Sequence, residues 1–301
     1  MKKVNTMIKE FSRKYAVLFA LLVSVLYISF FLGIGTILGV IAVKLSYDYY
    51  YTFFLIQEII GTAAAFFILK LSGLFDILKN KGTGIFKGFI TGGFFIFGSI
   101  MCLYEQLPYL CKSGLTLRSP FSIAMFVLTM IFIGASEEII SRGVITTMLY
   151  KKFGGTNSGI WKTVVISGLL FGIMHFTNMF ATMNPIGVLI QVAGVSVIGM
   201  VFSAIYLRNG TIWVNVVLHA FNDIAAGIPC IYIGQRPQNI IDDYKPIKLL
   251  GIILYAIVLL VLLRKNKIET IPANFAQLFA EPAENASFVK ASPVEATPVH
   301  E

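Results

Sequence analysis

The chain has 301 residues, of which 57% are hydrophobic and only 13% are charged, and its mean hydropathy is +0.81. This much apolar surface cannot be buried in one water-soluble core, so lipid has to be the solvent for most of the chain. The formal charge of +9 does not indicate a nucleic-acid partner, because no basic soluble domain carries it. The composition therefore predicts an all-α, polytopic membrane protein.

Eight segments are apolar and long enough, or nearly so, to cross a membrane as helices. About 20 residues at a rise of 1.5 Å span a hydrocarbon layer roughly 30 Å thick. In chain order, the expected spans are residues 17–43, 50–75, 88–104, 121–150, 164–180, 186–207, 212–233 and 249–263. The first is too long to read as a removable signal peptide and lacks a small-residue cleavage site, so we expect it to remain as a helix.

The distribution of Lys and Arg predicts how these spans are oriented, because positive residues in short loops are retained on the cytoplasmic side. If the basic N-terminal segment lies inside, eight spans place fifteen Lys and Arg residues inside and six outside. This bias favours an even number of spans with both chain ends in the cytoplasm. A compact single domain and a basic N-terminus without eukaryotic sorting signals favour a bacterial plasma membrane. The surplus positive charge also attracts anionic lipid.

The composition changes near the end of the chain. Residues 1–265 read as one transmembrane domain, whereas the tail, residues 266–301, is rich in Ala, Pro and Ser and, from residue 268 on, carries five Glu against one Lys. Such a composition is typical of a disordered tail, here expected in the cytoplasm. Cys102, Cys111 and Cys230 show no metal-binding spacing, and we expect them to be free thiols.

Charged side chains deep inside a membrane span are costly, so each one is a functional candidate. The candidates here are Glu58, Glu137, Glu138, Arg142 and Asp223, together with the histidines His175 and His219. The helical rise places Glu137, His175 and His219 at a similar depth in the cytoplasmic half of the membrane, so they can converge on one cavity. Glu58 falls in the other half and is expected to be separate.

Helical spacing separates the roles of these residues. Glu138 and Arg142 are i and i+4, so they can form an ion pair that offsets their burial. Glu137 projects about 100° away and is left free to accept a proton. Asp223 is i+4 from His219 and can orient the imidazole or reach the same cavity. A water molecule held between Glu137 and His175, and facing hydrogen-bond donors from His219, would be arranged for hydrolysis.

Each feature alone has a structural explanation. A Glu–Arg pair at i and i+4 more often stabilises a helix than carries chemistry. A single histidine in a membrane helix is as often a hydrogen-bond partner between helices as a catalyst. Two carboxylates and two histidines at one depth on three helices favour the functional interpretation, because each would separately carry the burial cost.

At these residues the sequence resembles the CAAX protease and bacteriocin-processing family, also called CPBP or Abi, of intramembrane endopeptidases. Three motifs carry the resemblance: E-E-I-I-S-R at 137–142, F-G-I-M-H at 171–175 and H-A-F-N-D at 219–223. Each motif is weak alone, but the three occur in order, each on an expected span. The resemblance covers roughly residues 121–227.

The resemblance implies roles for the motif residues. Glu137 and His175 would activate the attacking water, and His219 with the partner in the third motif would stabilise the oxyanion. An oxyanion site needs a hydrogen-bond donor, but the matching position is Asp223, which donates only when protonated. Asn222 could donate but lies about 100° around the helix. Either Asp223 orients His219, or the oxyanion site is weaker than in relatives that carry Asn.

The other motif residues, Glu138, Arg142 and Phe171, are expected to support the site. The family has also been discussed as metal-dependent, because two His and a Glu could hold zinc. We expect no cofactor, since the first motif is not the HExxH helix of zinc proteases and the two histidines lie on different helices. Zinc is the alternative.

The resemblance implies a peptide or membrane-protein substrate that is cleaved near the cytoplasmic side, as in bacteriocin maturation, immunity or signalling. Prenylated CAAX substrates are not expected, because eukaryotic sorting signals are absent. The alternative is a non-catalytic scaffold or immunity protein that regulates a membrane-bound signalling partner such as a sensor kinase. A proton-coupled transporter is disfavoured, because the sequence shows no inverted repeat or pair of broken helices.

Overall fold

The computed structural model describes residues 2–44, 50–110, 114–235, 241, 244 and 246–271. Most of the expected tail, residues 272–301, and Cys111 lie outside the described residues. Within these ranges Cys102 and Cys230 are free thiols, as expected.

The described chain is helical, and its only β-type pairing is an isolated bridge between Leu117 and Tyr232. This confirms the all-α prediction. The α-helices are α1 (Lys2–Lys14), α2 (Ala16–Lys44), α3 (Tyr50–Leu71), α4 (Ile85–Thr91), α5 (Gly93–Leu110), α6 (Pro120–Glu138), α7 (Thr147–Phe153), α8 (Asn157–Met174), α9 (Pro185–Asn209), α10 (Ile212–Gly227), α12 (Leu249–Leu262) and α13 (Lys265–Ile268). A π-helix, η2 (Ile139–Thr146), joins α6 to α7, and short 3₁₀ segments are η1 (Phe75–Lys79), η3 (His175–Phe180), η4 (Ile228–Ile231) and η5 (Pro246–Lys248).

Six of the described helical segments are long and apolar enough to cross a membrane. A seventh span results if α4 and α5, which are bent by 64° relative to one another, count together. The expected eighth span corresponds to the shorter apolar segment Pro246–Leu262. A polytopic membrane protein is therefore confirmed, whereas the count of eight is not.

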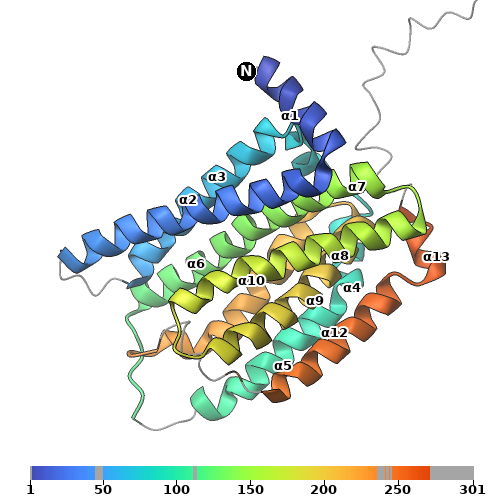
Figure 1. Cartoon of the computed structure of the whole chain (residues 1–301). Helices are drawn as coiled ribbons and strands as arrows, with labels where there is room; N and C mark the ends of the chain where they lie inside the picture. Colours follow the sequence, from blue (N-terminus) through green and yellow to red (C-terminus); the bar gives the residue numbers. More distant parts are fainter. Residues whose placement is uncertain are drawn as a thin grey trace, which may run out of the picture.

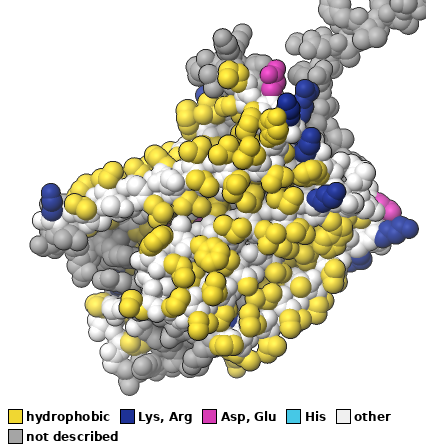
Figure 2. Space-filling view, viewed as in Figure 1, with side chains coloured by type: hydrophobic (Ala, Val, Ile, Leu, Met, Phe, Trp, Pro, Cys, Tyr) yellow, Lys and Arg dark blue, Asp and Glu magenta, His cyan; other side chains and the backbone are white. Residues whose placement is uncertain are grey.

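The surface of the helical bundle suits a lipid environment. Large apolar side chains are exposed along α2 and α12, for example Leu26 at 65% and Leu260 at 61%. Figure 2 shows apolar side chains covering the visible face, while most visible Lys and Arg side chains gather toward one end of the bundle. Helices α7 and α13 lie at this end, which we call the basic end (Figure 1).

Local sequence signals position the helices that carry the motifs. Ser119 caps α6, where its hydroxyl accepts a 3.2 Å hydrogen bond from the Ser122 amide, and a proline follows at the first helical position. Thr156 caps α8 by accepting from the Gly159 amide at 3.0 Å. Both caps satisfy amides that the first helical turn leaves without a partner.

The motif helices lie at the centre of the bundle (Figure 1). Helix α6 packs against α3 and α10, while α9 packs against α8 and α12, and α2 covers α3. The contact between α8 and α9 is close at Gly168, where a Cβ atom would lie 2.7 Å from both the Met200 amide nitrogen and the Ser196 carbonyl oxygen. Small residues allow such approaches between membrane helices.

We therefore predict that Gly168→Ala destabilises the protein by about 1–3 kcal/mol, because the added methyl group meets backbone atoms that cannot move independently. Thermal unfolding of the purified protein in detergent measures the effect. Gly39→Ala is the matched control, because a Cβ atom there has no neighbour within 4 Å and should change stability by less than about 0.5 kcal/mol. Equal effects of the two substitutions would contradict the close packing of α8 on α9.

Candidate functional site

The first motif lies where the helix geometry changes. Helix α6 ends at Glu138, and the buried π-helix η2 follows directly. In η2 the Thr146 hydroxyl donates to the Ser141 carbonyl at 2.8 Å, and the Thr147 hydroxyl donates to the Arg142 carbonyl at 2.9 Å, both five residues back. Short π-helical segments occur frequently at functional sites. Here the segment begins directly after the two glutamates and contains the arginine of the same motif.

Glu138 is the centre of a buried polar network. Arg142 Nη1 donates to Glu138 Oε1 at 2.9 Å, and both side chains are 0% exposed, so the ion pair predicted from their spacing is present. Asn215 Nδ2 donates to Glu138 Oε2 at 3.2 Å, and His219 Nδ1 lies 2.8 Å from Glu138 Oε1. A carboxylate in an ion pair accepts but does not donate, so the imidazole proton in this contact belongs to Nδ1.

The second motif contributes a ring that covers Arg142. The guanidinium carbon lies 4.5 Å from the centroid of the Phe171 ring and 5.1 Å from that of Phe202. Arg142 Nη2 also donates to the Gly199 carbonyl at 3.1 Å. Cation–π contacts of this kind are stronger when desolvated. Phe171 therefore helps to hold the buried cation, which accounts for an aromatic residue at the first position of the second motif.

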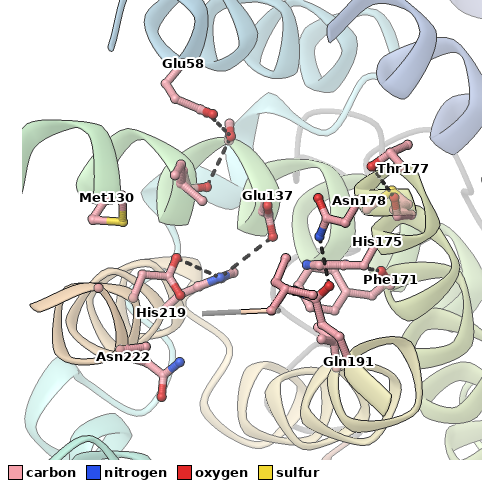
Figure 3. A pocket seen from close by; sticks show the side chains of 18 of the residues that line it. Glu58, Met130, Glu137, Phe171, His175, Thr177, Asn178, Gln191, His219 and Asn222 are labelled. Atoms are coloured by element: carbon pink, nitrogen blue, oxygen red, sulfur yellow. Dashed lines mark hydrogen bonds and ion pairs between the residues drawn. The ribbon is translucent and has the colours of Figure 1, made fainter. Parts of the chain in front are cut away.

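Glu137 points away from this network and into a cavity, as its position one residue from Glu138 predicts. Its side chain is 26% exposed, and Oε2 lies 3.7 Å from His219 Nε2. Glu137 Oε2 has no hydrogen-bond partner among the described residues. Figure 3 shows Glu137 and His219 directed toward one another. Of the two neighbouring carboxylates, Glu137 is the one available to a ligand.

The third motif directs its acidic residue at the same histidine. Asp223 Oδ2 lies 3.4 Å from His219 Nε2, one helical turn further along α10. The His219 ring also stacks on Phe202, with 5.3 Å between centroids and an angle of 20°. Asn222 and Asp223 both line the cavity. The structure therefore brings both candidate partners of His219 to the site.

His175 lies at the point where α8 ends and η3 begins. Its Nδ1 is 3.0 Å from the Phe171 carbonyl oxygen. Because a carbonyl only accepts hydrogen bonds, Nδ1 carries the proton in this contact, and Nε2 of the neutral ring is left as an acceptor. A histidine in this state can orient or deprotonate a water molecule.

The cavity has a volume of about 410 Å³ and is lined by residues of all three motifs. Along α6 its lining extends from Phe126 to Glu137, and along α10 from His219 to Gly227. Since α6 runs toward the basic end and α10 away from it, Glu137 and His219 form the floor of the cavity. The cavity extends from this floor away from the basic end. Neither Glu138 nor Arg142 lines it.

Glu58 was expected to be separate from the site, and this expectation is wrong. It lines the same cavity, and its Oε2 is 3.5 Å from the Ser136 hydroxyl oxygen. The physical reason is how the helices pack: α3 lies against α6 so that Glu58 is level with Ser136, the residue before Glu137. Counting residues from the end of each span does not record this register between two helices.

The sequence also did not predict three further polar residues that line the cavity and belong to none of the three motifs. Tyr27 comes from α2, while Asn178 and Gln191 come from η3 and α9, where Asn178 Nδ2 donates to Gln191 Oε1 at 2.9 Å. Glu58 carried a signal, because a carboxyl group inside a membrane span is costly. Tyr27, Asn178 and Gln191 carried none, since uncharged polar residues are common in membrane helices.

The described side chains do not offer a metal site. In residues 2–271, outside the gaps named above, no group of three or more His, Cys, Asp or Glu could hold a metal ion. We assign no step to a metal.

The buried network predicts that Glu138→Gln mainly affects stability. Loss of the carboxylate leaves Arg142 as an uncompensated buried charge, which costs about 3–5 kcal/mol. Adding Arg142→Gln should recover part of the loss. Unfolding of both single variants and the double variant in detergent, with abundance in membranes, measures the coupling.

The exposed pair Lys79–Asp76, with a separation of 2.8 Å and side chains 77% and 88% exposed, is the control for this cycle. Asp76→Asn should change stability by at most about 1 kcal/mol. A Glu138→Gln protein that unfolds like the wild type, with no coupling to Arg142, would show that the buried ion pair is absent.

Comparison with known proteins agrees with the motifs. Residues 119–225 match the family model described as "Type II CAAX prenyl endopeptidase Rce1-like", and this range contains the three motifs. No curated protein and no solved structure matches the chain. The Rce1-like match over residues 119–225 thus confirms the resemblance that the three motifs predict for this part of the chain.

Proposed function

We propose that this protein is an intramembrane endopeptidase in which Glu137 activates a water molecule for the hydrolysis of a peptide bond. The observation that carries the proposal is the contrast between two adjacent carboxylates. Glu138 is fully engaged by Arg142, Asn215 and His219, whereas Glu137 faces the cavity next to His219. The match to an endopeptidase family supports the same reaction.

In the first step, water lies between Glu137 and His175. Glu137 accepts one proton of the water, while the water oxygen forms a bond with the carbonyl carbon of the substrate and the carbonyl electron pair moves to its oxygen. His175, with the lone pair of Nε2 free, orients the water. His219 acts as the imidazolium: Nδ1–H donates to Glu138, and Nε2–H donates to the oxyanion together with the Asn222 amide.

In the second step the oxyanion collapses and the C–N bond breaks. The proton held by Glu137 passes to the leaving amine, so that the enzyme returns to its starting state with a carboxyl and an amine product. We assign Asp223 to positioning, because its Oδ2 lies 3.4 Å from His219 Nε2 and keeps the ring on the cavity floor. In the family motif the neutral donor stands four residues after the histidine. In this proposal Asn222, three residues after His219, supplies that donor.

The substrate in this proposal is a peptide or a membrane protein in a bacterial plasma membrane. With both chain ends in the cytoplasm, the basic end is cytoplasmic, and hydrolysis takes place at the cytoplasmic end of the cavity. The cavity then receives the substrate from the membrane interior. Bacteriocin maturation, immunity and control of a membrane-bound signalling protein are processes that need such cleavage.

Glu137→Gln tests the function directly. The variant keeps the shape of the side chain but removes the base, so cleavage should fall by about 10²- to 10⁴-fold while the protein inserts and accumulates normally. Comparative peptidomics of membranes with wild-type and variant protein measures the effect. Glu105→Gln is the control, since Glu105 is exposed and pairs with Lys248 at 3.4 Å. An unchanged phenotype of Glu137→Gln would favour the non-catalytic scaffold.

Metal dependence can be tested separately on the purified protein. We expect peptidase activity to persist in strong chelator and the zinc content to be far below one ion per chain, because Glu137 itself activates the water. Metal analysis and activity assays on the same samples provide the measurement. Stoichiometric zinc that is lost and restored together with activity would establish a metalloprotease instead.

A further inference from the structure

Glu58 is a buried acidic group that the proposed reaction does not use. The residue is 3% exposed and lines the cavity. In the part of the chain that the structure describes, no Lys, Arg or His forms an ion pair with it, whereas Glu138 has Arg142 and His219. A buried carboxylate without a cation is unfavourable. A positively charged partner from outside the chain would balance the negative charge of Glu58.

Among the described residues, Ser136 is the neighbour within hydrogen-bond distance of Glu58, and it is a weak partner. The Ser136 hydroxyl lies 3.5 Å from Glu58 Oε2 but only 3.1 Å from the Ile133 carbonyl oxygen. A hydroxyl has a single proton, and hydrogen bonds from O–H donors are normally 2.5–3.0 Å long. The proton is therefore directed mainly at the Ile133 carbonyl, and Glu58 Oε2 has only a long, weak contact with Ser136.

A second polar group that lacks a short hydrogen bond, the Tyr27 hydroxyl, faces the same part of the cavity. The Tyr27 side chain is 6% exposed, and its hydroxyl has no hydrogen-bond partner among the described residues. A Cβ atom at Gly61, one turn after Glu58 on α3, would lie 3.3 Å from this hydroxyl and 3.1 Å from the Phe31 ring. The glycine thus lets Tyr27 and Phe31 of α2 approach the face of α3 that carries Glu58.

Aromatic rings complete the surroundings of these two groups. Tyr27, Phe31 and Phe54 line the cavity together with Glu58, and Phe54 lies one turn before Glu58 on α3. Ring faces attract Lys and Arg side chains, most strongly where water is excluded. An unpaired carboxyl group, an unpaired hydroxyl and several rings are together suited to a cation on a long apolar stem.

We infer that Glu58, Tyr27 and the adjacent rings form a subsite for a basic side chain, Lys or Arg, of the substrate. The inference rests on the proposed function, since it defines which peptides that active site accepts. Ser136 precedes Glu137 on α6 and touches Glu58, so the basic residue would lie next to the scissile bond. Pairing with Glu58 also offsets the cost of bringing the substrate charge into the membrane.

Binding rather than cleavage tests the subsite, so that failure of the proposed reaction does not affect the readout. Two fluorescent apolar peptides, blocked at both ends, differ only at one central position, which is Lys or its uncharged analogue norleucine. Their Kd values are measured by anisotropy on full-length protein carrying Glu137→Gln, which prevents consumption of the peptide. We expect the Lys peptide to bind at least about tenfold more tightly.

Glu58→Gln, added to the same background, should bring the ratio of the two Kd values to about one, and Tyr27→Phe should reduce it. Glu105→Gln, an exposed acidic residue outside the cavity, should leave the ratio unchanged. A ratio near one with Glu58 present, a preference that survives Glu58→Gln, or no saturable binding of the Lys peptide would overturn the subsite. Hydrolysis of either peptide by the wild type reports on the proposed function separately.

Discussion

The ion pair between Glu138 and Arg142 is the interaction on which the rest of the site depends. Both groups are 0% exposed, and neither could remain charged there without the other. Further partners stabilise each buried charge. Asn215 and His219 bind the carboxylate, and the Gly199 carbonyl and two phenylalanine rings contact the guanidinium. The pair thereby connects helices α6, α9 and α10 and the end of α8.

Adjacent identical residues acquire different chemistry because the helix turns by about 100° between them. Glu138 faces the interior of the bundle and is used for stability, while Glu137 faces the cavity and keeps an oxygen free of hydrogen bonds to the described residues. The π-helix begins directly after the pair. A change in helix geometry at this point alters the direction of the following side chains without moving the two glutamates.

Local spacing explains which features could be predicted from the sequence. The Glu138–Arg142 pair, the free Glu137 and the contact from His219 to Asp223 all follow from i, i+1 and i+4 relations within one helix. The place of Glu58 could not be predicted, because it depends on how α3 lies against α6 and on how far the cavity extends. The number of spans was not predictable either, because hydropathy does not record the 64° bend between α4 and α5.

The contact between Glu138 and His219 joins stability to chemistry. Glu138 accepts the hydrogen bond from Nδ1–H and thereby stabilises the imidazolium that the proposed reaction requires. The proton on Nε2, which faces Glu137 and Asp223, thus depends on a residue that does not line the cavity. Arg142 in turn keeps Glu138 ionised and acts on the imidazole through it. Because this buried network holds His219 Nδ1 at 2.8 Å from Glu138, the orientation of His219 is fixed before any substrate arrives, which is the preorganisation that stabilisation of an oxyanion requires.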